Sequence, residues 1–144
     1  MLKVKDKMTT NVATVPPNAT VAEAAKLMQK HNVGSVPVTD GGNLVGIVTD
    51  RDIVVRNIAH DFDPKSTPVS NIMTTNLVTV TPDATIDEVT QKMSAHQVRR
   101  IPVVENQKLV GMVSIGDVAT DRRFDVEASK ALSEISRPSR PEML

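Results

Sequence analysis

The chain of 144 residues contains the same stretch of sequence twice. Residues 8–54 align with residues 73–119 at a constant offset of 65, and 20 of the 47 aligned pairs are identical. Both copies begin with Met-Thr-Thr-Asn and carry Leu-Val-Gly near their end. Because a solenoid needs about three or more stacked repeats, two copies favour half-domains packed face to face about a pseudo-two-fold axis. That arrangement predicts two related clefts where the copies meet.

Length and composition favour a single domain with an aliphatic core. A chain of this size can bury about 68–70% of its unfolded surface, whereas one repeat of about fifty residues is small for a core of its own. Apolar residues make up 40% of the chain, but its aromatic residues are Phe62 and Phe124 alone. Proteins that bind single-stranded nucleic acids stack the bases on aromatic side chains, and the net charge here is zero. The composition therefore disfavours nucleic acid as a partner.

The sequence also constrains the cellular compartment. Cysteine is absent, which excludes disulfides and thiolate metal sites and fits a reducing compartment. Residues 1–6 contain no apolar signal core, and no window approaches the roughly 18 consecutive apolar residues of a membrane-spanning helix. We therefore expect a soluble cytoplasmic protein with no membrane partner.

Each copy predicts the element order β-α-β-β-α, in an α+β (α/β-type) fold. In the first copy, Thr20 and Glu23 form a capping box in front of a helix that ends near residue 31. The turn at residues 40–43 carries Gly-Gly and joins two strands. The predicted strands are 12–15, 36–39 and 44–48 in the first copy and 77–80, 101–104 and 109–113 in the second, and the second helix of each copy starts near Thr49 or Ser114.

The expected domain boundaries follow the duplication. We assign residues 1–60 to repeat 1, residues 61–71 to a linker and residues 72–122 to repeat 2. The linker is polar and rich in proline, as suits a surface crossing. Residues 123–144 are expected to form a C-terminal helix, over about 126–135, and a flexible tail.

The strand-to-helix corner is the element that carries chemistry. Residues 46–52 and 111–117 both end a strand at a hydroxyl residue, with an Asp three positions later. This spacing fits a capping box. It also fits a nucleotide site, in which free helix N–H groups and Arg51 bind phosphate and the Asp accepts two ribose hydroxyls. The chain uses Glu23 and Glu88 at its other caps, and this choice of Asp at both corners favours the nucleotide site.

The combined motifs resemble tandem cystathionine-β-synthase (CBS) domains, a Bateman module, over about residues 1–120. The resemblance rests on the repeat order, on the segments 31–38 and 96–103, and on the Gly-x-x-Thr/Ser-x-x-Asp corners. It implies a regulatory module that binds AMP, ADP or ATP, or alternatively S-adenosylmethionine, in two clefts. It also implies a homodimer and a regulated partner protein, which the sequence does not name.

The resemblance further implies that each cleft takes its base contacts from one copy and its hydroxyl–Asp pair from the other. One cleft would use Ala13, Gly34, Ser35 and Pro37 with Met112, Ser114 and Asp117. The other would use Val78, Arg99, Ile101 and Pro102 with Ile47, Thr49, Arg51 and Asp52, and Arg100 as an additional phosphate ligand. Because the second cleft gathers three arginines, we expect it to bind its ligand more tightly and to prefer more phosphates.

Two other classes of function compete with this interpretation. An enzyme is disfavoured because the sequence has no Ser/His/Asp or Cys/His constellation and no paired histidines at metal spacing. We therefore expect no catalytic residues, no metal site and no catalytic cofactor. A structural or interaction protein with empty clefts is the remaining alternative.

Overall fold

The computed structural model describes residues 2–119 and 125–135, with the side chains of 125–129 left aside. The chain divides into two compact units. The first-repeat unit contains residues 11–77 and 106–109, and the second-repeat unit contains residues 1–10, 78–105 and 110–144.

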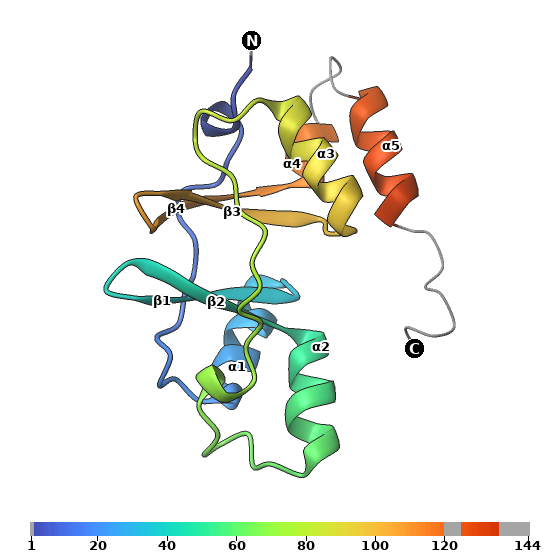
Figure 1. The fold of residues 1–144 in the computed structure, drawn as a ribbon. Coiled ribbons are helices and arrows are strands. Elements are labelled where there is room, and N and C mark those ends of the chain that lie inside the picture. The colour runs from blue at the N-terminus through green and yellow to red at the C-terminus, as the bar shows by residue number, and fades with distance from the viewer. Residues whose placement is uncertain (1, 120–124, 136–144) are drawn as a thin grey trace. The chain divides into compact units, whose positions relative to one another are not determined.

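The first-repeat unit is built on a β-hairpin with helices on one side (Figure 1). Strands β1 (Ser35–Asp40) and β2 (Asn43–Thr49) pair antiparallel, with Ser35 opposite Thr49. At the hairpin end, Asn43 also pairs with Lys108. The helices are α1 (Val21–His31) and a run that begins with α2 (Asp50–Asp52), continues as a π-helix (Ile53–Asn57) and ends as a 3-10 turn (Ile58–His60). A further 3-10 turn spans Val69–Asn71.

The second-repeat unit has the same plan with one added helix. Strands β3 (Arg100–Glu105) and β4 (Lys108–Ser114) are neighbours in the sheet. Helix α3 (Ile86–His96) corresponds to α1, and α4 (Ile115–Ala119) corresponds to α2. Helix α5 (Asp125–Ile135) packs on α3 and α4 (Figure 1). The predicted helix near 126–135 is therefore confirmed, while residues 136–144 of the predicted tail lie outside the described residues.

Local sequence signals explain the ends of the first helix. The Thr20 hydroxyl accepts a hydrogen bond from the Glu23 amide, and the Glu23 carboxylate accepts one from the Thr20 amide, each at 3.1 Å. The helix ends at Asn32, whose φ of 52° is left-handed, a conformation that Asn tolerates better than most residues. These bonds confirm the predicted capping box.

The first predicted strand of each copy is wrong in length. Val15 forms a single parallel bridge with Val38, and Val80 forms the matching bridge with Val103. The Val15 amide donates to the carbonyl of Pro37 at 3.1 Å. Extending the ladder toward residue 13 would require an N–H from Pro37, which proline lacks. Pro102 stops the ladder in the same way in the second copy.

The leading segment of each copy packs in the unit built from the other copy. Val69 and Ile72 are buried in the core of the first-repeat unit, where Thr74 pairs with Ile47. Val4 is buried in the core of the second-repeat unit, where Thr9 pairs with Met112. The boundaries predicted from the sequence define contiguous domains. In the structure, each compact unit instead includes the leading segment of the other copy.

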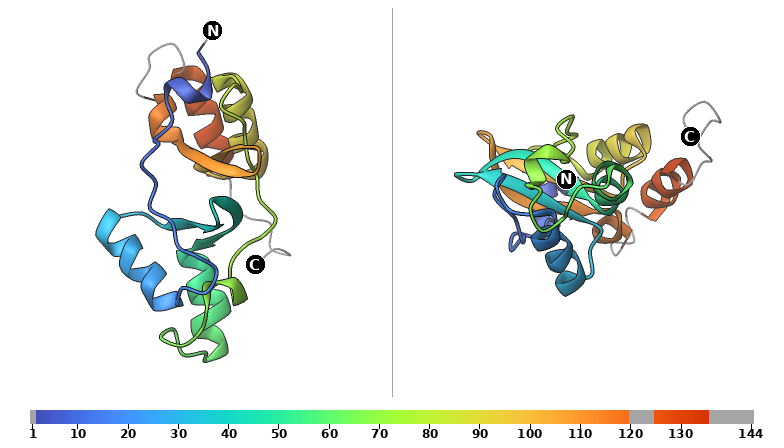
Figure 2. Two further views of the ribbon diagram at one scale, coloured as in Figure 1. Left: turned by 90° about the vertical axis from the view of Figure 1, so that its left-hand side faces the viewer. Right: turned by 90° about the horizontal axis from the view of Figure 1, so that it is seen from below.

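The N-terminal segment is fastened to the start of α3. The N-terminal 3-10 turn (Val4–Asp6) lies beside the chain that leads into α3 (Figure 2, left). The Val4 amide donates to the Ala84 carbonyl at 2.8 Å. Lys5 Nζ lies 3.3 Å from a carboxylate oxygen of Asp83, and Lys3 Nζ lies 3.6 Å from the same oxygen. The hydrogen bond from Lys5, together with the charges of both lysines, holds the pKa of Asp83 below its usual value. Because the ion pairs of Lys3 and Lys5 with Asp83 are exposed, they stabilise the contact little. The buried Val4 side chain therefore contributes most of the anchoring.

Candidate functional site

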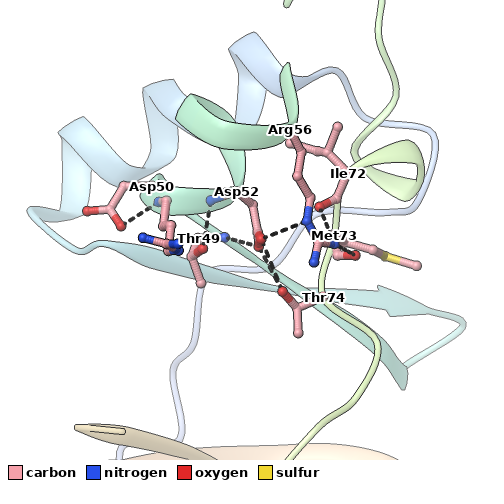
Figure 3. Close-up of polar contacts among 8 residues, drawn as sticks. Thr49, Asp50, Asp52, Arg56, Ile72, Met73 and Thr74 are labelled. Atoms are coloured by element: carbon pink, nitrogen blue, oxygen red, sulfur yellow. Dashed lines mark hydrogen bonds and ion pairs between the residues drawn. The ribbon is translucent and has the colours of Figure 1, made fainter. Parts of the chain in front are cut away.

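The first corner, at the end of β2, is closed by a reciprocal capping box. The Thr49 hydroxyl accepts from the Asp52 amide at 3.0 Å, and an Asp52 carboxylate oxygen accepts from the Thr49 amide at 3.0 Å (Figure 3). This is the same pattern that Thr20 and Glu23 form. The use of Asp instead of Glu is therefore compatible with capping as well as with ligand binding, and the ligand-binding role of Asp52 stays a prediction.

The second corner has the same hydrogen bonds at the end of β4. The Ser114 amide donates to an Asp117 carboxylate oxygen at 2.8 Å, and the Asp117 amide donates to the Ser114 hydroxyl at 3.2 Å. The duplication has therefore preserved the backbone geometry of the corner along with its residues.

The amides at the start of α2 are already paired. The Asp50 amide donates to the Gly34 carbonyl at 2.9 Å, the Arg51 amide donates to the Asp50 carboxylate at 2.8 Å, and the Asp52 amide is bound by Thr49. The expectation of free N–H groups for an anion is therefore wrong at this corner. A phosphate bound here would depend on side-chain cations instead.

Asp52 has more partners than a cap requires. Its side chain is buried, with the residue only 6% exposed. The Thr74 hydroxyl lies 3.1 Å from each carboxylate oxygen, and Arg56 Nε lies 3.7 Å from Oδ1 (Figure 3). The chain itself therefore contacts both oxygens, so a ribose bound at Asp52 would share this carboxylate with Thr74 and Arg56.

The structure brings each corner next to the predicted base-contact segment of its own copy. Ser35 lies opposite Thr49 in the hairpin, and a Cβ added to Gly34 would lie 3.0 Å from Asp50 Oδ2. In the second copy, the Ile115 amide donates to the Arg99 carbonyl at 2.8 Å. The expectation that each cleft takes its base contacts from one copy and its hydroxyl–Asp pair from the other concerns both units together. It stays a prediction.

The remaining candidates divide between surface and interior. The candidate arginines are exposed: Arg51, Arg99 and Arg100. The half-buried candidates are Ala13, Val78 and Ile47, and the buried ones are Pro37, Ile101, Pro102 and Met112. Arg51 lies in the same unit as Gly34 and Ser35. Arg99 and Arg100 lie in the same unit as Gly116. Each unit therefore supplies its own cations near its corner.

Three residues near the first corner were missed from the sequence: Arg56, Asn57 and Thr74. Thr74 had a signal, because it belongs to the repeated Met-Thr-Thr-Asn start. Arg56 and Asn57 had none, since the aligned positions in the second copy are Asp121 and Arg122. Their contacts arise from the tertiary packing of the helical run on residues 69–74.

Two further classes of site, metal centres and membrane spans, are absent from the described part of the chain. Over residues 2–119 and 125–135, no group of three or more His, Cys, Asp or Glu side chains is placed to hold a metal ion. None of the helices in these ranges has the length and apolar character needed to cross a membrane.

Comparisons with known proteins agree on one family. The sequence profile described as CBS domain matches residues 4–57 and 69–121. The chain is 48% identical over 136 residues to the CBS domain-containing protein YhcV of Bacillus subtilis, covering 94% of this chain and 96% of that protein.

Two solved structures with similar folds are a complex with adenosyl compounds and a hexameric assembly. The CBS domain pair of the protein MJ0100, in complex with 5-methylthioadenosine and S-adenosyl-L-methionine, is 34% identical with a TM-score of 0.72, over 83% of this chain and 94% of that chain. A hexameric CBS-CP12 protein from bloom-forming cyanobacteria is 33% identical with a TM-score of 0.72, over 86% of this chain and 70% of that chain.

Proposed function

Because the chain belongs to the CBS domain family, we propose that it is a regulatory module that binds an adenosyl nucleotide at its strand-to-helix corners and transmits occupancy to a partner protein. The observation that carries this proposal is the repeated corner. Thr49 with Asp52, and Ser114 with Asp117, have the same hydrogen bonds in both copies.

The ligand classes we propose are AMP, ADP and ATP. Asp52 and Asp117 are the acceptors suited to ribose hydroxyls, and the exposed arginines are the donors suited to phosphate. The adenosyl compounds bound by the protein MJ0100 support this class. They also favour a second candidate, a sensor of S-adenosylmethionine, which would use the same ribose contacts and fewer of the arginines.

The module acts without catalysis of its own in this proposal, and it works in the cytoplasm. The corner residues Asp52 and Asp117 both accept hydrogen bonds from backbone amides. Because each carboxylate already serves as an acceptor within its corner, we assign it to hydrogen-bond acceptance in ligand binding. ATP turnover above the level of a blank would contradict this part of the proposal.

The test of ligand binding begins with mass spectrometry of small molecules released from the purified protein, followed by calorimetric titration with AMP, ATP and S-adenosylmethionine. We expect at least one of them to bind. We expect Arg51→Met to weaken ATP binding by about ten- to a hundred-fold, the loss of one charge-assisted hydrogen bond. Lys26→Met, which removes an exposed cation from α1, should leave the affinity unchanged. Absence of binding by all three compounds would favour a structural protein with empty sites.

We further propose that the chain forms a homodimer through the outer face of the helical run 50–60. Val54, Val55 and Ile58 are exposed on this run, and Phe62 is exposed just after it. The Phe62 ring stacks on His60 with centroids 5.7 Å apart. Exposed apolar clusters of this kind mark interaction surfaces, and the hexamer formed by the CBS-CP12 protein supports self-association in this fold.

Charge placed on this face should dissociate the dimer. We expect Ile58→Asp to shift the protein from dimer to monomer in light scattering coupled to size exclusion, because the carboxylate would be buried without a partner. Leu132→Asp is the matched control, since Leu132 is also an exposed apolar side chain but lies on α5. A wild-type monomer at all concentrations, or a dimer that survives Ile58→Asp, would contradict this proposal.

A further inference from the structure

The residues that fasten segment 72–74 to the first corner form a clasp, defined here as Asp52, Arg56 and Thr74. Arg56 Nη1 lies 3.4 Å from the Ile72 carbonyl oxygen and 3.3 Å from that of Met73. Its Nε lies 3.7 Å from Asp52 (Figure 3). One guanidinium therefore links the candidate ribose acceptor to the backbone of the segment, which leaves the first-repeat unit at residue 77.

We propose that Arg56 is a positioning residue that couples occupancy of the first corner to release of segment 72–74. This inference rests on the proposed function. Ribose hydroxyls that approach the buried Asp52 carboxylate would compete with Thr74 and Arg56 for position around its two oxygens. Weakening of these contacts would leave segment 72–74 held by the Ile47–Thr74 backbone pair and by the burial of Ile72.

The backbone of the helical run is divided between two registers at this point. Ile53–Asn57 is π-helical, and π turns within α-helices are frequent at functional sites. The Ile58 amide donates to both the Ile53 and the Val54 carbonyls, the first being a π-type bond and the second an α-type bond. One shared amide thus belongs to both registers. Because a side chain turns by about 100° per residue around an α-helix, a change of register would swing Arg56 away from the clasp.

Asn57 shows that the observed register carries a cost. The residue is 0% exposed, and neither Oδ1 nor Nδ2 has a hydrogen-bond partner among the described residues. A buried polar group without a partner is destabilising. The unpaired Asn57 amide therefore works against the observed packing, whereas the contacts of Arg56 support it. Such a balance is what a ligand-responsive element requires, since a ligand can shift only states that are close in free energy.

The test uses the full-length protein and amide hydrogen exchange measured by NMR, read at Thr74, whose amide donates to the Ile47 carbonyl at 2.7 Å. Without ligand, we expect Arg56→Met to speed exchange of this amide at least about tenfold. We expect Asn57→Leu to slow it, because the apolar side chain removes the unpaired amide group. Lys26→Met is the control for loss of a cation, and Asn11→Leu, at an exposed position, is the control for the Asn replacement.

The same measurement is then repeated with saturating AMP, ATP or S-adenosylmethionine. Wild-type protein should exchange faster at Thr74 when ligand is bound, and Arg56→Met should show no further change. Equal exchange rates at Thr74 in ligand-free Arg56→Met and Lys26→Met would overturn the clasp, as would faster exchange in Asn57→Leu. Should Arg56→Met lose its circular dichroism signal, Arg56→Gln replaces it with the same expected result. If calorimetry shows that no adenosyl compound binds, the proposed function fails, while the ligand-free comparison still decides whether the clasp exists.

Discussion

A fragment spanning residues 11–77 is expected to fold, whereas a fragment spanning residues 1–60 is expected to remain unfolded. The shorter fragment follows the duplication in the sequence but omits Val69 and Ile72, which are 0% and 1% exposed in the core of the first-repeat unit. Removing a buried aliphatic side chain typically costs about 2–5 kcal/mol. Two such losses are comparable with the total stability of a small domain, about 5–15 kcal/mol.

Circular dichroism and urea denaturation distinguish the two fragments. We expect a cooperative transition for 11–77 and none for 1–60. Both lack residues 106–109, which belong to the same unit, so that omission cannot explain a difference between them. Ile72→Ala within fragment 11–77 is the matched control and should lower the free energy of unfolding by about 2–5 kcal/mol. A cooperative transition in 1–60 would mean that the first copy completes its core without the exchanged segment.

The sequence was most informative where neighbouring residues decide the structure. Thr20 and Glu23 bond to each other's backbone three residues apart, and the turn at 40–43 contains two glycines with positive φ. Such local signals do not depend on the rest of the fold. The corners at Thr49 and Ser114 could be placed for the same reason.

The features that the sequence did not reveal depend on distant residues. The amides of Asp50 and Arg51 are paired because Gly34 returns beside the corner and because Asp50 folds back on its neighbour. Arg56 reaches carbonyls sixteen and seventeen positions away, and its aligned residue in the second copy has the opposite charge. A repeat alignment highlights what two copies share, so a contact present in one copy alone is invisible to it.

Gly111→Ala is expected to destabilise the protein by about 1–3 kcal/mol, the usual cost of overpacking a filled site. A Cβ at this position would lie 2.8 Å from Met8 Sδ and 2.9 Å from the Thr9 carbonyl oxygen. The Met8 side chain can move, but the Thr9 backbone is fixed by its pair with Met112, with hydrogen bonds of 2.8 and 2.9 Å. Relief of the clash would therefore require breaking the pair that holds the exchanged N-terminal segment.

Gly46→Ala provides the matched comparison in the first-repeat unit. A Cβ on Gly46 would meet the Met73 side chain, with Sδ at 2.5 Å, and no backbone atom is among its nearest neighbours. In double-mutant cycles followed by thermal unfolding, Met73→Ala should therefore remove most of the cost of Gly46→Ala. Met8→Ala should leave most of the cost of Gly111→Ala in place, because the Thr9 oxygen remains. If Met8→Ala and Met73→Ala reduced the destabilisation by the same amount, the backbone at Thr9 would move as easily as a side chain. That result would argue against the Thr9–Met112 pair as a rigid anchor.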